Sequence, residues 1–168
     1  MTIEETMKAY IAGLFDGEGT VYIYKTKPLS ARNMINPTYT LACSLSNTNH
    51  NSLVLLKELF GGTISLRSLS ELSVKSSWQW SVASKKALFF LETIYPYLRI
   101  KEQEAKEAIL FQKYMTRTRR FCRGKGRPRP KSEVAILDEF YQCLRNMKRQ
   151  SGFSINDRKD TQFQFCFN

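Results

Sequence analysis

The ten residues Tyr10–Gly19, YIAGLFDGEG, constrain the fold of this 168-residue chain more than any other segment. They begin as an apolar helix and end in two acidic residues set among glycines. Ala9, Gly13 and Gly17 recur every four residues, so they lie on one face of that helix. Small residues at this spacing let a second helix approach backbone to backbone. We expect this second helix to be the same helix of a second chain.

The acidic end of this segment carries the candidate chemistry. Gly17 and Gly19 predict that the helix stops and a strand begins here, which leaves the Glu18 carboxylate pointing away from the core. In a two-fold symmetric pair of chains the two Glu18 carboxylates lie close together, and their repulsion favours a divalent cation between them. Mg²⁺ binds a few carboxylates with water and phosphate oxygens, which points to phosphodiester chemistry. Ordinary helix-ending turns also combine glycine with acids, so this short pattern alone leaves both interpretations open.

Composition favours a nucleic-acid partner and one core. Lys and Arg number 26 against 15 Asp and Glu, which gives a net charge of +11. We expect a single domain over residues 1–152 and a tail over residues 153–168. No apolar run suits a membrane span or a signal peptide, so we expect a soluble, intracellular protein that meets DNA and has no membrane partner. The cysteines form no C-x-x-C pair and His50 is the only histidine, which argues against zinc.

Hydrophobic periodicity predicts an α+β fold in the order αββαββα. Alternating apolar residues predict strands at residues 21–27, 38–46, 63–68 and 77–83. Helical spacing predicts a helix before the first strand, one up to residue 60 and one at about residues 85–95. A further helix follows Pro96 and is expected to end near Met115. An extra C-terminal helix is expected at about residues 132–147.

One face of the predicted sheet is polar and carries little charge. Such a face suits the major groove of DNA, where β-strands present side chains to base edges. We expect base-side contacts from Tyr22, Tyr24, Thr26, Thr40, Ser44, Arg67 and Gln79. An ordinary solvated sheet face is the alternative. Tyr22 and Tyr24 favour binding, because they otherwise expose apolar area to water without a use for it.

Residues Arg117–Lys131 contain eight basic residues, no acid, two glycines and two prolines. Such runs are often solvated tails or localisation signals. Here the run connects two predicted helices, so we expect a tethered loop that contacts DNA phosphates independently of sequence. The side chains assigned to this contact are Arg117, Arg119, Arg120, Arg123, Lys125 and Arg127.

The segment Ile11–Gly19 resembles the nine-residue signature of the LAGLIDADG homing endonucleases, and the resemblance extends by pattern over about residues 7–115. It implies a curved four-stranded antiparallel sheet over DNA, with the motif helix at a dimer interface to which we assign Ala9, Gly13 and Asp16. A single copy of the motif implies a homodimer. Glu18 stands where the family has its metal-binding acid, more often Asp, and Gly17 where the family lends a main-chain carbonyl. The longer Glu side chain is expected to shift the metal position.

Two further residues gain a role from the same resemblance. Lys101, in the segment PYLRIK, stands where the family has a basic residue beside the scissile phosphate. A solvated lysine at a helix start is the alternative. Asn47 stands where the family has a polar residue that orders water around the metals. A turn or cap role explains Asn47 equally well.

These observations predict a homodimeric homing endonuclease that makes a staggered double-strand cut in a long, partly palindromic DNA site. Mg²⁺ is the expected cofactor, with Mn²⁺ as a substitute, and Glu18, Lys101 and Asn47 are the expected catalytic residues. Two alternatives keep the same scaffold: an RNA maturase that assists splicing, and a noncatalytic DNA-binding regulator. Retention of Glu18 favours cleavage over the maturase. Regulators on this scaffold usually carry an added helix-turn-helix domain, for which we expect no room.

Overall fold

The computed structural model describes residues 3–27, 36–67, 77–121 and 129–150 and confirms the predicted α+β class. The predicted order αββαββα, with an extra C-terminal helix, is also confirmed. The elements are α1 (Glu5–Glu18), β1 (Gly19–Thr26), β2 (Thr38–Asn47), α2 (His50–Phe60), β3 (Thr63–Arg67), β4 (Ser77–Ala83), α3 (Ser84–Ile94), the short 3-10 helix η2 (Tyr95–Tyr97), α4 (Glu102–Phe121) and α5 (Lys131–Gln150). The tail assigned to residues 153–168 lies outside the described ranges. None of the helices described is long and apolar enough to cross a membrane.

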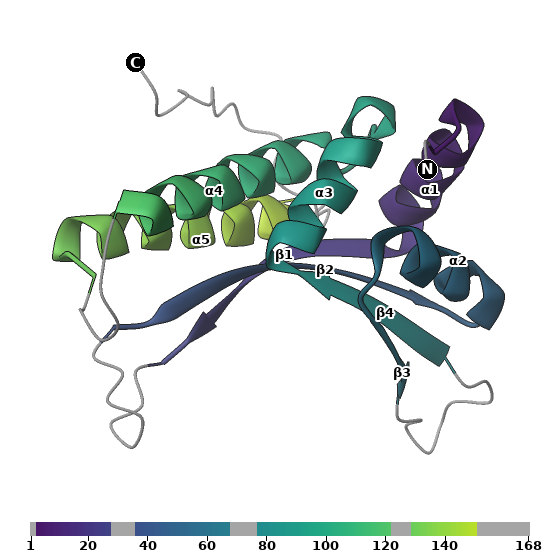
Figure 1. Ribbon diagram of the computed structural model, residues 1–168, viewed down its shortest axis with the longest axis horizontal. Coiled ribbons are helices and arrows are strands. Elements are labelled where there is room, and N and C mark those ends of the chain that lie inside the picture. The colour runs from purple at the N-terminus through teal and green to yellow at the C-terminus, as the bar shows by residue number, and fades with distance from the viewer. Residues whose placement is uncertain (1–2, 28–35, 68–76, 122–128, 151–168) are drawn as a thin grey trace.

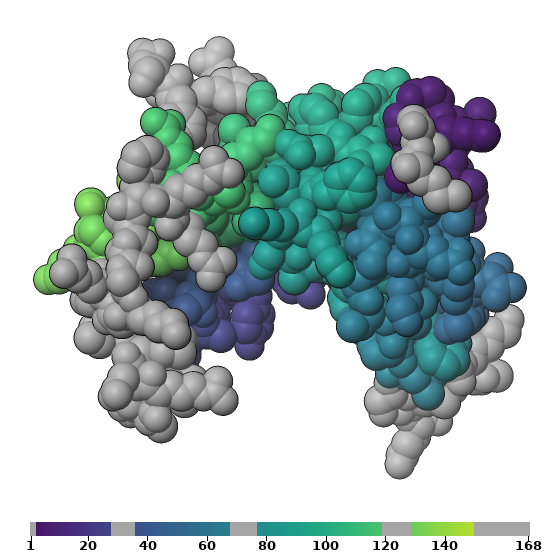
Figure 2. Space-filling model, viewed as in Figure 1, coloured from purple at the N-terminus to yellow at the C-terminus, as the bar shows by residue number. Residues whose placement is uncertain are grey.

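The four strands form one antiparallel sheet in the order β1-β2-β4-β3. Figure 1 shows this sheet as an arch, with the helices on its convex side and its concave side left open. The space-filling view in Figure 2 shows a hollow beneath the arch, between its two halves. The strands therefore present one face to the protein core and the other to this hollow.

The core lies between the convex side of the sheet and the helices. Alternate strand residues such as Val21, Leu41 and Trp80 are fully buried there, as the period-two pattern predicts. The ring of Phe90 from α3 meets the rings of Trp80 and Phe15 edge to face, with centroids 5.0 Å apart in both pairs. α1 and α3 are thereby fixed on the middle of the sheet.

The basic run is partly helical, which corrects the expectation of a loop that starts after Met115. α4 continues to Phe121, so Arg117, Arg119 and Arg120 belong to the helix. The reason is local, because arginine is a good helix former and the first helix-breaking residue is Gly124. The side chain of Arg117 is exposed. Three further predicted phosphate contacts lie outside the described residues, namely Arg123, Lys125 and Arg127.

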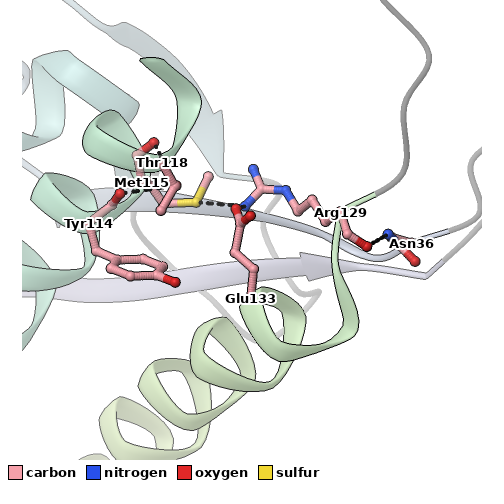
Figure 3. A network of polar contacts seen from close by, with 6 residues as sticks. All are labelled: Asn36, Tyr114, Met115, Thr118, Arg129 and Glu133. Carbon is pink, nitrogen blue, oxygen red and sulfur yellow. Dashed lines mark hydrogen bonds and ion pairs between the residues drawn. The ribbon is translucent and has the colours of Figure 1, made fainter. Parts of the chain in front are cut away.

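Arg129 connects three parts of the chain at the start of α5 (Figure 3). Its guanidinium donates to Glu133 Oε1 at 2.8 Å and to the sulfur of Met115 in α4 at 3.4 Å. Its main-chain carbonyl accepts a 2.9 Å hydrogen bond from the Asn36 side chain, just before β2. This arginine of the basic run is therefore used within the protein.

Replacing Arg129 by alanine is expected to lower the free energy of unfolding by about 2 kcal/mol, because the nearly buried Glu133 loses a charge-assisted hydrogen bond. Urea denaturation measures this loss. Lys113→Ala is the control, since its ion pair with Glu92 is exposed on both sides and contributes at most about 0.5 kcal/mol. Equal losses in the two variants would contradict an internal role for Arg129.

Candidate active site

The candidate site is built around the junction of α1 and β1. Glu18 is the last residue of α1 and is exposed, and its carboxylate makes no hydrogen bond or ion pair with any residue that the structure describes. Gly17 beside it is also exposed. Gly19 is buried against the Phe15 ring, and a side chain at Gly19 would collide with that ring. The helix therefore turns into the strand within one residue, which fixes the Glu18 backbone at the edge of the concave face.

Asp16 ties this junction to the start of α4. Its carboxylate accepts main-chain hydrogen bonds from Arg99 at 2.8 Å, Ile100 at 3.2 Å and Lys101 at 2.9 Å. Only 8% of Asp16 is exposed. This intrachain role was missed in the sequence, where two acids in one glycine-rich turn gave no sign that one of them points inward. The assignment of Asp16 to a dimer interface stays a prediction, with little side-chain surface left for it.

The structure places Lys101 at the motif, and its role beside the scissile phosphate stays a prediction. The Lys101 ammonium donates a hydrogen bond to the main-chain carbonyl of Asp16, two residues before Glu18. Lys101 is only partly exposed, which a freely solvated lysine at a helix start would not be. The Lys101 ammonium therefore lies at the end of α1, the helix whose last residue is Glu18.

Asn47 lies at the end of β2, close to the same junction. Gly19 at the start of β1 pairs with Leu45, so Asn47, two residues further along β2, lies opposite the end of α1. The Asn47 side chain accepts a 2.8 Å hydrogen bond from the main-chain nitrogen of Asn49, which caps α2. The turn role is thus observed, and the role in ordering water stays a prediction.

The oxygen atoms at this junction suit a hard divalent cation as ligands. The Glu18 carboxylate is free of intrachain partners in the part of the chain described, and the end of a helix leaves main-chain carbonyls such as that of Gly17 without helical donors. No group of three or more His, Cys, Asp or Glu side chains occurs among the described residues. One chain therefore offers one carboxylate, and Mg²⁺ would take its other ligands from water, phosphate and a second chain.

The concave face carries the predicted base-side contacts. Register places Tyr22 beside Ala42 and Tyr24 beside Thr40, all on this face. Tyr24 is 60% exposed and is available to a ligand. Thr26 shares a hydrogen bond with the Thr38 hydroxyl. Gln79 and Thr40 are partly exposed, and Arg67 is exposed at the end of β3.

Ser44 is the least available of the seven side chains predicted to contact bases. It faces the hollow but is only 7% exposed, since it lies on an inner strand between Thr20 and Ser81. No Asp or Glu side chain lies on the concave face of the described strands. The face is therefore open to a polyanion.

An ion pair and a hydrogen bond to the same carboxylate connect α5 to β1 and β2. Lys25 pairs with Asp138 of α5, and the Tyr39 hydroxyl donates to the same carboxylate at 3.0 Å. The hydrogen bond from Lys25 lowers the pKa of Asp138 and in turn raises the pKa of Lys25. Lys25 also lies 5.5 Å from the centre of the Tyr141 ring. Lys25 is therefore committed to α5.

Comparison with solved structures agrees with this architecture. The archaeal intron-encoded homing endonuclease I-Vdi141I, solved with DNA, superposes with a TM-score of 0.67 at 14% identity, over 92% of this chain and 91% of that one. The homing endonuclease I-TnaI gives a TM-score of 0.59 at 14% identity, over 89% and 99%. The homing endonuclease I-CvuI, solved with its target in the presence of 2 mM Ca, gives 0.55 at 18% identity, over 82% and 93%. At such identities these similarities establish the fold.

The family is established by sequence. No curated protein matches the chain at a significant level. The family model described as LAGLIDADG endonuclease matches residues 11–116, which is more than half of the chain and includes the motif, the sheet and Lys101. This protein belongs to the LAGLIDADG endonuclease family.

Proposed function

We propose that this protein is a site-specific homing endonuclease that works as a homodimer inside the cell and makes a staggered double-strand cut in a long, partly palindromic DNA site. The observation that carries the proposal is the exposed Glu18 carboxylate, which has no partner among the described residues and lies close to Lys101. Glu18 directly precedes β1, and the described strands carry no acidic side chain on their concave face, on a chain with a net charge of +11. The proposed catalytic residues would therefore adjoin the proposed surface for DNA.

Each residue of the junction has a task in this reaction. Glu18 and the Gly17 carbonyl would hold Mg²⁺, or Mn²⁺ in its place, and the bound cation would acidify the attacking water and neutralise phosphate charge. The Lys101 ammonium would stabilise the extra negative charge that develops on the scissile phosphate. Asn47 would orient water near Glu18. Solved relatives support the partners, since I-CvuI was also solved with DNA in the presence of 2 mM Mg, revealing DNA not cleaved.

The proposed activity is tested with a library of DNA duplexes that contain a randomised segment. The purified protein is incubated with the library in Mg²⁺, in Ca²⁺ and in EDTA, and cut and bound molecules are sequenced separately. Cutting at one long site in Mg²⁺, with no cutting in EDTA, is the expected result. Binding of DNA without cutting in any divalent metal would favour a regulator, and preference for structured intron RNA would favour a maturase.

The homodimer is tested at Gly13. Its exposed position on α1 has nothing within 4 Å of an added Cβ, and leucine is a better helix former than glycine, so we expect the single chain to accept leucine at this position. Gly13→Leu is expected to leave helix content unchanged and to convert the dimer to monomer in analytical ultracentrifugation, because the small-residue face no longer allows close approach. Glu58→Leu, at an exposed position of α2, is the control and should stay dimeric. A Gly13→Leu dimer would count against an interface on this face.

A further inference from the structure

Lys148 lies in the last turn of α5, where α5 meets α4 and β1. Its ammonium nitrogen is 5.8 Å from the centre of the Tyr22 ring, a cation–π distance. Tyr22 belongs to the concave face by its strand register. The C-terminal helix therefore places a positive charge at the rim of the face assigned to DNA.

A second lysine acts on the same carboxylate as Lys148. Lys148 and Lys101 both interact electrostatically with Glu104 in the first turn of α4. Burial raises the pKa of Glu104, and the two lysines act against this shift. Burial lowers the pKa of Lys148. The Glu104 carboxylate opposes this shift, and the charge of Lys101 lowers the pKa of Lys148 further. Two lysines thus share one carboxylate in a partly buried place.

Burial of a second ammonium beside Lys101 carries a cost in desolvation. A helix C-terminus favours a cation, and the exposed Arg149 satisfies that preference at no desolvation cost. Withdrawing a second ammonium from water beside Lys101 costs free energy, and a bound anion would offset that cost. The main-chain amides before α4 are already occupied by Asp16. A phosphate that arrives here would therefore be held by lysine side chains.

We propose that Lys148 contacts a DNA phosphate next to the one served by Lys101, so that α5 helps to hold the strand that is cut. The proposal rests on the function proposed above and adds a residue of the C-terminal helix to it. Lys148 is a positioning residue in this role, because phosphate contacts fix the DNA without selecting its sequence. Tyr22 keeps the ammonium at the rim of the concave face.

The test compares Lys148→Met with Lys148→Arg and with Lys106→Met, which removes the same charge from an exposed position of α4. Binding to the cleavage site is measured in Ca²⁺ over a range of KCl concentrations. Lys148→Met is expected to reduce the slope of log K against log salt by about 0.9 per subunit. Its cleavage rate should fall about tenfold, as for loss of one charge-assisted hydrogen bond. Lys148→Arg should restore the slope, and Lys106→Met should not change it.

A modified DNA locates the contact. Duplexes with one neutral methylphosphonate are scanned across the phosphates that flank the cut. At one position the wild type should lose affinity while Lys148→Met loses nothing further, because the contact is already absent. If the two proteins lose affinity in parallel at every position, the proposal is overturned.

Two results keep this proposal separate from the proposed function. A wild-type protein that neither binds nor cuts any DNA would overturn the function itself, whereas a wild type that cuts and a Lys148→Met variant with unchanged salt slope would overturn only the role of Lys148. Glu104→Gln tests the same idea if Lys148→Met does not fold. Loss of the shared carboxylate frees both lysines for phosphate, so several-fold tighter binding is expected, and unchanged binding would overturn the proposal.

Discussion

Replacing Glu18 by glutamine is expected to lower the rate of DNA cleavage by at least about a thousandfold, with DNA affinity in Ca²⁺ reduced by no more than about twofold. Glutamine keeps the size of the side chain and removes only the charge that would hold the cation. Glu18 is exposed and unpaired within the described chain, so the fold does not depend on it. Single-turnover cleavage in Mg²⁺ and equilibrium binding in Ca²⁺ measure the two effects.

The matched control is Glu5→Gln, at the other end of α1. Glu5 is also exposed, and its ion pair with Lys8 is a surface contact of small value. Glu5→Gln removes the same charge from the same helix and should cut at the wild-type rate. Glu18→Asp should retain cleavage, since a carboxylate remains one methylene further back. Cleavage by Glu18→Gln at the wild-type rate would remove Glu18 from the reaction.

Replacing Asp16 by alanine is expected to lower the free energy of unfolding by about 4 kcal/mol. Three main-chain amides before α4 lose their acceptor in a place that water barely reaches, and each unsatisfied donor costs about 1–3 kcal/mol. Cleavage should fall as well, because the same contacts hold the Lys101 backbone beside the motif. Urea denaturation and single-turnover cleavage check both results.

Asp138→Ala is the control for Asp16. That carboxylate also accepts from two partners, but it is substantially exposed and the pair with Lys25 is screened by water, so a loss of about 1 kcal/mol is expected. Asp16→Asn should fall between, since its amide keeps one accepting oxygen. If Asp16→Ala were as stable as Asp138→Ala, the hydrogen bonds between Asp16 and the residues before α4 would contribute less to the free energy of unfolding than their geometry indicates.

The sheet could be predicted from sequence because its signals are local. Period-two alternation predicted the ends of the strands to within two residues. Asn49 caps the start of α2, and Gly61 ends this helix. The predicted end of α4 near Met115 was wrong because the run of positive charge was interpreted as a loop. Arginine itself favours helix, and residues 116–121 contain no helix-breaking residue. The helix propensity of the individual residues therefore determined where α4 ends, and the run of charge did not.

The site was only partly predictable because half of it depends on distant contacts. The motif and the resemblance named Glu18 and Lys101, and the fold places the Lys101 ammonium against the Asp16 carbonyl, two residues before Glu18. The partners of Asp16 lie 83 to 85 residues away in the chain, and no local pattern identifies such contacts. Lys148 was not singled out in the sequence, because its position beside Tyr22 depends on how α5 packs in the fold.

The strand order has a consequence for how DNA specificity can be altered. β1 and β3 are the two edges of the sheet, three strand spacings apart, which is about 14 Å or roughly four base-pair steps. We therefore expect Tyr24 on one edge and Arg67 on the other to serve different base pairs. Sequence preferences set by the two hairpins should combine independently, so variants selected separately on each hairpin could be joined in one chain to address a new target.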